Sequence, residues 1–130
     1  MAGPLKTCFL IDDDEDDRDI FLLALEDLGS KFNCVMADNC VKALEMLRDG
    51  TVKPDYIFLD LNMPVVSGRE CLVEIRKMHQ YDKTPVLIYT TSSVPADVEA
   101  MIKLGATSFI TKPNKISALT NVIKDVFTAS

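Results

Sequence analysis

The chain has 130 residues and a net charge of −6, because 20 acidic side chains outnumber 14 lysines and arginines. This length fits one domain of ordinary size, which buries a core without disulfides or a structural metal, and it leaves no room for two. With 48% hydrophobic and 26% charged residues, the composition excludes the disordered and collagen-like classes. The acidic balance disfavours non-specific binding to nucleic acid or to an anionic membrane surface.

No segment indicates a membrane span or an export signal. The longest apolar run, residues 20–25, is far shorter than the roughly 20 residues that cross a bilayer. The N-terminus lacks a charged leader before a long apolar stretch, so we expect a cytoplasmic protein. The cysteines have no C-x-x-C spacing and lie within apolar patterns, which predicts buried thiols rather than a zinc site or disulfides. They are Cys8, Cys34, Cys40 and Cys71.

Apolar runs of strand length recur along the chain and alternate with segments of helical period. The runs cover residues 7–11, 34–37, 56–59, 86–89 and 108–111. Continuous runs of this length are typical of strands buried on both faces, as in a parallel sheet. The predicted inward positions of the five intervening helices are Ile20, Leu23, Ala24 and Leu28; Val41, Leu44 and Leu47; Leu72 and Ile75, with His79 following near the helix end; Val98, Met101 and Ile102; and Ile116, Leu119, Ile123 and Val126.

Start and stop signals flank the predicted helices. Ser67 and Glu70 have capping-box spacing before the third helix, and Pro95 opens the fourth. Glycines end the first, second and fourth helices, at Gly29, Gly50 and Gly105. Five βα units follow, and right-handed crossovers then place helices on both faces of the sheet. The predicted fold is a doubly wound α/β sandwich that forms a single domain over residues 1–130.

Polar residues stand directly after four of the predicted strands. Asp12 and Asp13 follow the first strand and Asp60 the third; Thr90 and Thr91 follow the fourth, and Lys112 with Pro113 follows the fifth. In open α/β sheets, ligands bind beyond the carboxyl ends of the strands. We therefore expect three carboxylates, a hydroxyl and an ammonium to meet at one edge of the sheet.

Three carboxylates within a few ångströms repel one another, and either a raised pKa or a bound cation relieves the repulsion. An oxygen-only cluster without His or Cys favours Mg²⁺, which readily shares a phosphate oxygen. Three carboxylates, one Mg²⁺ and Lys112 sum to a neutral site. An ionised Asp60 needs no general base to attack phosphorus, so the pattern predicts phosphoryl transfer to Asp60, with Thr90 donating to a phosphoryl oxygen.

Each of these residues also has a purely structural interpretation. Residues 12–17 are an unbroken run of acids, and acidic side chains are stabilised at a helix N-terminus, so we interpret residues 14–17 as a solvated helix face. Thr90 also suits a strand, and Lys112 before a proline suits a turn. The coincidence of all these residues at strand ends favours the functional interpretation.

Several motifs in this order resemble the receiver domain of bacterial two-component response regulators, over about residues 6–127. They are Phe9-Leu10-Ile11-Asp12-Asp13, Asp60-Leu61-Asn62-Met63-Pro64 with Gly68, Val86-Leu87-Ile88-Tyr89-Thr90, Gly105-Ala106 before Phe109, and Lys112-Pro113. The resemblance implies a flavodoxin-like, five-stranded parallel sheet of order 2-1-3-4-5 with five helices. It further implies a stand-alone receiver, similar to the chemotaxis regulators, without an output domain.

The resemblance also implies which residues hold the metal and accept the phosphoryl group. Asp60 would be the phosphoacceptor. Asp12, Asp13, Asp60 and the main-chain carbonyl of Asn62 would bind Mg²⁺.

The same resemblance implies a switch. Thr90 and Lys112 would contact the phosphoryl group, and a cis bond between Lys112 and Pro113 would aim the lysine into the cleft. Phosphorylation would draw Thr90 inward and let Phe109 fill the vacated space, which changes the surface of the fourth helix, fifth strand and fifth helix. A downstream protein would bind that surface.

The implied phosphodonor is a histidine kinase or a histidine phosphotransfer protein, and no nucleic acid or membrane partner is expected. Whether the chain forms a homodimer stays open. Because the chain would catalyse only its own phosphorylation and dephosphorylation, we do not expect an enzyme in the usual sense.

Two positions, Thr91 and Phe109, depart from the commoner receiver pattern. Thr91 stands where a small residue is usual, and the run through Ser92 and Ser93 resembles the single-domain subgroup paired with phytochrome-type histidine kinases. A bulkier Thr91 beside the phosphoryl group predicts slow self-dephosphorylation. Phe109 replaces the more frequent Tyr, so switching there would work by packing alone. His79 is interpreted as solvated.

Two other classes of function compete. A phosphatase of the haloacid dehalogenase type places D-x-D after its first strand, as Asp12 and Asp14 do, and turnover of a phosphomonoester would identify it. A nucleotide- or flavin-binding module would need a glycine-rich phosphate loop, and neither usual motif is present in the sequence.

Overall fold

The computed structural model describes residues 6–28, 32–91 and 94–128, and its strands form one parallel sheet of order β2-β1-β3-β4-β5. The strands are β1 (Lys6–Ile11), β2 (Phe32–Ala37), β3 (Tyr56–Leu59), β4 (Val86–Thr90) and β5 (Ser108–Thr111). Every adjacent pair is parallel. The predicted fold class, strand positions and strand order are therefore confirmed.

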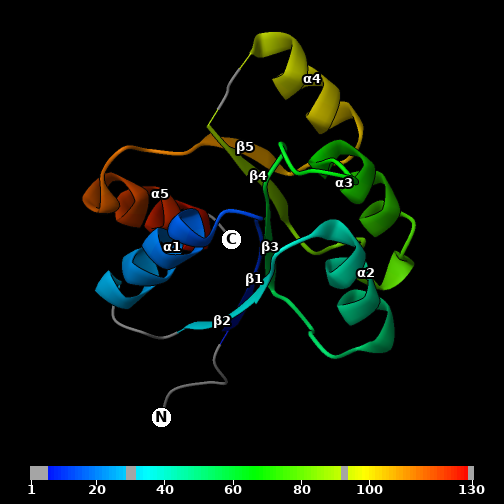
Figure 1. Cartoon of the computed structure of the whole chain (residues 1–130), viewed down its shortest axis with the longest axis horizontal. Helices are drawn as coiled ribbons and strands as arrows, with labels where there is room; N and C mark the ends of the chain where they lie inside the picture. Colours follow the sequence, from blue (N-terminus) through cyan, green and yellow to red (C-terminus); the bar gives the residue numbers. More distant parts are fainter. Residues whose placement is uncertain (1–5, 29–31, 92–93, 129–130) are drawn as a thin grey trace.

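Helices cover both faces of the sheet (Figure 1). α1 (Glu15–Asp27) and α5 (Ile116–Thr128) lie on one face; α2 (Cys40–Asp49), α3 (Gly68–Arg76) and α4 (Pro95–Lys103) lie on the other. A short 3₁₀ helix, η1 (His79–Tyr81), follows α3. Because strand side chains alternate, Phe9 and Ile11 of β1 join the apolar cluster under α2, α3 and α4, whereas Cys8 and Leu10 join the cluster under α1 and α5.

The helix boundaries follow local hydrogen bonding. Ser67 accepts a hydrogen bond from the backbone N–H of Glu70 at the start of α3, as its spacing predicted. Gly50 ends α2 with φ 77°, the left-handed conformation that glycine adopts without strain. The glycine predicted to end the first helix, Gly29, lies outside the described residues.

The predicted inward faces of the helices are only partly right. Leu23, Val41, Ile102 and Ile116 were predicted inward but are exposed. In α1 the inward stripe is Phe21, Ala24 and Leu25. Spacing alone does not fix how a helix rotates on the sheet, and the larger Phe21 packs edge-on against Phe58 of β3, which turns Leu23 outward. His79 also leaves the predicted third helix, because α3 ends at Arg76, and its imidazole is exposed.

All four cysteines are free thiols, as predicted, and only Cys34 is partly exposed.

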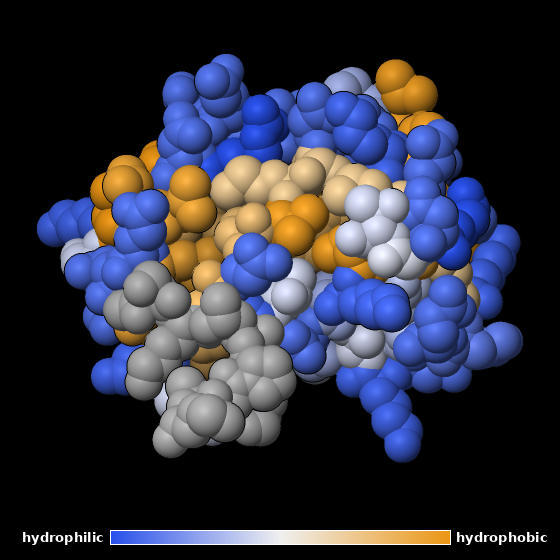
Figure 2. All heavy atoms as spheres, turned by 90° about the horizontal axis from the view of Figure 1, so that it is seen from below, coloured by the Kyte–Doolittle hydropathy of each residue, from blue (hydrophilic) through white to orange (hydrophobic). Residues whose placement is uncertain are grey.

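In the described part of the chain, no helix combines the length and apolar character that a bilayer crossing requires. Figure 2 views the molecule from below Figure 1; a band of hydrophobic residues crosses the middle of this face, and hydrophilic residues surround it. Polar and apolar side chains are thus segregated on this face rather than evenly mixed.

The loop between β3 and α3 contains one strained residue. Val65 has φ 67°, the left-handed region, and its side chain is 97% exposed. A β-branched residue is disfavoured there, because its Cβ approaches the carbonyl oxygen that follows. Because the Val65 side chain is exposed, it gains little packing energy to offset the conformational cost of this φ. The loop therefore keeps Val65 in a conformation that valine disfavours.

Val65→Asn should therefore stabilise the chain by about 1 kcal/mol, because asparagine tolerates the left-handed region. Urea denaturation monitored by circular dichroism measures the change. Val65→Thr is the matched control, since threonine is equally exposed and β-branched and should give no gain. An equal gain in both variants would mean that polarity, not backbone conformation, sets the effect.

Candidate functional site

The ends of β1 and β3 place two carboxyl groups side by side. Ile11 pairs with Leu59 in the sheet, so the residues that follow, Asp12 and Asp60, leave the same edge together. The backbone N–H of Asp60 donates to the carbonyl of Ile11 at 2.9 Å, which extends the pairing by one residue. Both aspartates are buried. The predicted convergence of strand ends is thus present for these two residues.

Asp13 completes a cluster of three carboxylates. One oxygen from each of Asp12, Asp13 and Asp60 lies within 4.8 Å of the other two. Asp13 is exposed, so the cluster opens to solvent on one side. An all-oxygen set of anionic donors fits a hard divalent cation such as Mg²⁺ or Mn²⁺, which would also relieve the repulsion between the carboxylates. The residues present therefore suit the metal that the sequence predicted.

The ammonium of Lys112 lies among these carboxylates. Its Nζ donates to Oδ2 of Asp12 at 2.8 Å and to Oδ2 of Asp17 at 2.7 Å, and it lies 3.7 Å from Oδ2 of Asp60. The Lys112 side chain is only 7% exposed. Tyr89 places its ring beside the ammonium, 5.1 Å from Nζ to the ring centroid. Lys112 is thus the counter-ion of the acidic site, as expected.

The bond between Lys112 and Pro113 is trans, so the predicted cis bond is wrong. The backbone N–H of Lys112 donates to the carbonyl of Thr90 at 2.6 Å, which continues the β4–β5 pairing up to this residue. That pairing already directs the lysine side chain at the carboxylates. The ordinary trans form, which is favoured for most X–Pro bonds, therefore suffices.

Burial raises the pKa of Asp60 to about 6. Lys112 opposes this shift, while the negative charges of Asp12 and Asp13 add to it. For Lys112, burial disfavours the charged form, but hydrogen bonds to Asp12 and Asp17 and the charge of Asp60 outweigh burial and raise the pKa of the ammonium. Lys112 stays charged, and Asp60 is an energetically disfavoured anion at neutral pH.

Thr90 lies fully buried at the end of β4, and a side-chain hydrogen bond joins it to the loop between β3 and α3. The amide of Asn62 donates to the Thr90 hydroxyl at 3.3 Å, and the Asn62 backbone N–H donates to Oδ1 of Asp60, also at 3.3 Å. The resemblance implied only a main-chain role for Asn62, so the contact of its side-chain amide with Thr90 is an addition. Phe109 is partly buried against the α2–α4 cluster, and Thr91 is exposed. Ser92 and Ser93 lie outside the described residues.

Gly68 holds the β3–α3 loop against Asp60. Its backbone N–H donates to the carbonyl of Leu61 at 2.9 Å. A Cβ at this position would lie 2.2 Å from the carbonyl oxygen of Asp60 and 2.6 Å from Cα of Leu61, and both contacts are with backbone. Glycine is therefore required by close approach, which explains its place in the motif.

The acids of the 12–17 run have three different fates. Asp14 caps α1, because its carboxylate accepts the backbone N–H of Asp17 at 3.1 Å, and it is not among the three clustered carboxylates. That position argues against a phosphatase built on Asp12 and Asp14. Asp17, which was predicted to be solvated, instead binds Lys112. No signal in the sequence separates it from its acidic neighbours.

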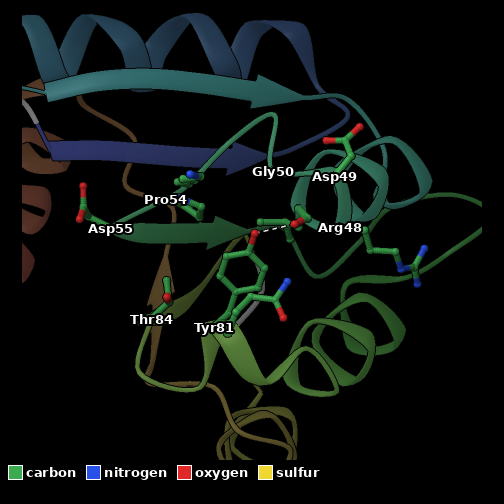
Figure 3. Close-up of a pocket in the computed structure, with 10 residues that line it drawn as sticks. Arg48, Asp49, Gly50, Pro54, Asp55, Tyr81 and Thr84 are labelled. Carbon is green, nitrogen blue, oxygen red and sulfur yellow. Dashed lines mark hydrogen bonds between the residues drawn. The ribbon is translucent and has the colours of Figure 1, made fainter.

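A pocket of about 500 Å³ lies at the opposite end of the strands (Figure 3). It is formed by the loops that lead into β3 and β4, and charges of both signs line it, including Arg48, Asp49 and Asp55. The hydroxyl of Tyr81 donates to the carbonyl of Leu47 beside it. None of the predicted site residues lines this pocket, so the acidic edge remains the candidate site.

A family model described as the response regulator receiver domain matches residues 8–124. The sensor histidine kinase CheAY of Helicobacter pylori is 34% identical over 114 residues, which cover 88% of this chain and 14% of the kinase. The chain thus spans about a seventh of that relative's length.

Two solved structures are similar over nearly the whole chain. The Mn²⁺-bound response regulator Rcp1, a protein of Synechocystis sp., is 25% identical with a TM-score of 0.82, and the match covers 93% of this chain and 91% of Rcp1. The phosphorylated cyanobacterial phytochrome response regulator RcpA is 29% identical with a TM-score of 0.85, and the match covers 94% of this chain and 91% of RcpA. One relative therefore binds a divalent cation and another carries a phosphoryl group.

The raised pKa of Asp60 predicts that replacing its carboxyl group stabilises the folded chain, and that this gain depends on pH. As pH rises from about 4 to about 6, the unfolded chain ionises Asp60 before the folded chain does, so folding loses free energy in this window. Asp60→Asn removes that loss and should stabilise the metal-free chain by about 2 kcal/mol at neutral pH.

Urea denaturation in a chelator, at about pH 7 and again at about pH 4, tests this expectation. The gain should be present at neutral pH and should shrink at about pH 4, where Asp60 is protonated in the folded chain and about half protonated in the unfolded chain. Asp97→Asn, an exposed acid in the first turn of α4, is the control. A gain of the same size at both pH values would contradict the assignment to Asp60 ionisation.

Proposed function

The chain belongs to the family of response regulator receiver domains, and on that premise we propose that Asp60 accepts a phosphoryl group from a histidine kinase or a histidine phosphotransfer protein. The observation that carries this proposal is the convergence of Asp12, Asp13 and Asp60 within 4.8 Å, with the ammonium of Lys112 facing them. Such a site combines an anionic nucleophile with the positive charge that phosphoryl transfer needs.

The proposed transfer uses the carboxylate of Asp60 directly. A carboxylate oxygen of Asp60 forms the new bond to phosphorus while the bond from phosphorus to the donor's imidazole nitrogen breaks, and the imidazole leaves with that electron pair. Burial keeps water away from the nucleophile, and its raised pKa makes it more basic than an exposed aspartate. No general base is needed, because Asp60 carries no proton when it attacks.

The other residues neutralise and hold the charge. Mg²⁺, bound by Asp12, Asp13, Asp60 and the main-chain carbonyl of Asn62, would supply positive charge at the transferring group. Lys112 binds a phosphoryl oxygen from the side of β5, and the hydroxyl of Thr90 donates to another. The support is the donor chemistry of the acidic cluster and the Mn²⁺-bound relative Rcp1.

The signal in this proposal is a repacking that begins at Thr90. Its hydroxyl exchanges the amide of Asn62 for a phosphoryl oxygen and moves inward. Phe109, which lies partly buried against the apolar cluster under α2, α3 and α4, then occupies the vacated space by packing alone. The face formed by α4, β5 and α5 changes shape, and a downstream protein binds it.

We further propose that the protein acts as a single-domain regulator in the manner of Rcp1 and RcpA, each of which it matches over 91% of the relative's length. The cytoplasm is the proposed compartment, because its reducing conditions suit four free thiols. The proposed chemistry acts on the chain itself, through its own phosphorylation and dephosphorylation.

Incubation with Mg²⁺ and acetyl phosphate should add one phosphoryl group to the chain, detected as a mass increase in the intact protein. Asp60→Asn should lose this increase, and a chelator should abolish it in the unaltered chain. Asp97→Asn, an exposed aspartate on α4, is the control and should be phosphorylated normally. An unchanged mass in the unaltered chain, or steady turnover of a phosphomonoester such as 4-nitrophenyl phosphate, would refute the proposal.

Thr91→Ala should accelerate loss of the phosphoryl group, because the smaller side chain admits the hydrolytic water more easily. Thr91 follows the buried Thr90 and is itself exposed at the edge of the site. The measurement is the decay of phosphorylated protein after the donor is removed, with Thr128→Ala at the end of α5 as control. A decay that is unchanged or slower in Thr91→Ala would exclude this role.

A further inference from the structure

Asp17 contacts Lys112 but is neither one of the clustered carboxylates nor the proposed phosphoacceptor. Asp17 belongs to α1 and is 95 residues from Lys112 in the chain. At 2.7 Å, its Oδ2 is as close to the ammonium as Oδ2 of Asp12 is, at 2.8 Å. Lys112 thus divides its hydrogen bonds between a carboxylate inside the acidic cluster and one outside it.

Burial distinguishes this ion pair from an ordinary surface pair. The Lys112 side chain is 7% exposed and that of Asp17 is 29% exposed, whereas exposed pairs such as Lys42–Asp38 have both partners more than half exposed. Exposed pairs contribute little, because water screens them and both side chains remain mobile. The Lys112 ammonium is held on one side by α1 and lies beside the Tyr89 ring on another, so its position is well defined.

The geometry leaves one hydrogen of the ammonium for Asp60. An ammonium has three N–H donors, of which two reach Asp12 and Asp17. Oδ2 of Asp60 lies 3.7 Å from Nζ, which is beyond hydrogen-bond distance but close enough for an ion pair. A phosphoryl oxygen on Asp60 projects further than the carboxylate oxygen does, so Lys112 can bind it with little displacement.

Asp12 alone does not secure Lys112 during the reaction, because a divalent cation in the cluster would share that carboxylate. Asp17 is not one of the clustered carboxylates, so its hold on Lys112 does not compete with the cation. We infer that Asp17 is a positioning residue that keeps the Lys112 ammonium directed at the phosphoryl group on Asp60. This inference rests on the proposed function, since it assumes that Asp60 carries the phosphoryl group.

Beryllofluoride, a stable analogue of the phosphoryl group on aspartate, tests the inference without turnover. Asp17→Asn should weaken Mg²⁺-dependent binding of beryllofluoride by roughly tenfold, the size expected for loss of one charge-assisted hydrogen bond, as measured by ¹⁹F NMR titration. Asp16→Asn is the matched control, because Asp16 is also an acid in the first turn of α1 but is exposed. It removes the same formal charge and should bind almost as the unaltered chain does.

A second measurement observes Lys112 directly. The ¹⁵N-bound hydrogens of its ammonium should give a slowly exchanging NMR signal in the unaltered chain and in Asp16→Asn, and this signal should broaden in Asp17→Asn. Thermal melting curves are recorded for Asp17→Asn and Asp16→Asn. Similar curves would show that the effect of Asp17→Asn does not come from a general loss of structure. Asp17→Glu, which keeps the charge, should recover part of the affinity.

The outcomes separate the two proposals. If the unaltered chain does not bind beryllofluoride, the proposed function fails and Asp17 has nothing to position. If the unaltered chain binds it and Asp17→Asn binds it as tightly as Asp16→Asn or more tightly, the proposed function stands and the role of Asp17 is overturned. Weaker binding with an unchanged Lys112 signal would also overturn it, because the effect would then not pass through the lysine.

Discussion

The arrangement of the site depends on one constraint, which is that neighbouring parallel strands end at the same edge of the sheet. Because β1 and β3 pair up to Ile11 and Leu59, Asp12 and Asp60 must lie together, and both are buried. Two buried carboxylates repel each other, so the fold needs a cation at this edge. Lys112, which directly follows β5, supplies this positive charge. The β4–β5 pairing continues to its backbone N–H, which places its side chain beside the carboxylates.

Features of the site lower the stability of the folded chain. The raised pKa of Asp60 means that the ionised, reactive form is disfavoured by its surroundings. The adjoining loop adds a left-handed Val65, and it needs a glycine at position 68 because the Asp60 carbonyl occupies the space of a Cβ. Disfavoured charge and strained backbone thus lie in one segment of the chain, where the proposed phosphorylation of Asp60 would add further negative charge.

Features that follow from local sequence were predictable, whereas features that depend on packing between distant elements were not. The strands, the Ser67 cap and the Gly50 helix end follow from short patterns, and strand ends then located Asp12 and Asp60. The rotation of α1, set by Phe21 against the sheet, was not predictable from apolar spacing alone.

Asp17 shows the same limit and changes the charge balance of the site. Counted without it, three carboxylates, one ammonium and a divalent cation are neutral. With it, four carboxylates and one ammonium carry a formal charge of −3, which a divalent cation reduces only to −1. Without the cation, an incoming phosphoryl donor meets a strongly anionic cleft in which the single ammonium is already bound by two carboxylates. In the proposed function, the cation would then be needed for the donor's approach as well as for the transfer itself, and Lys112 would act mainly by position rather than by net charge.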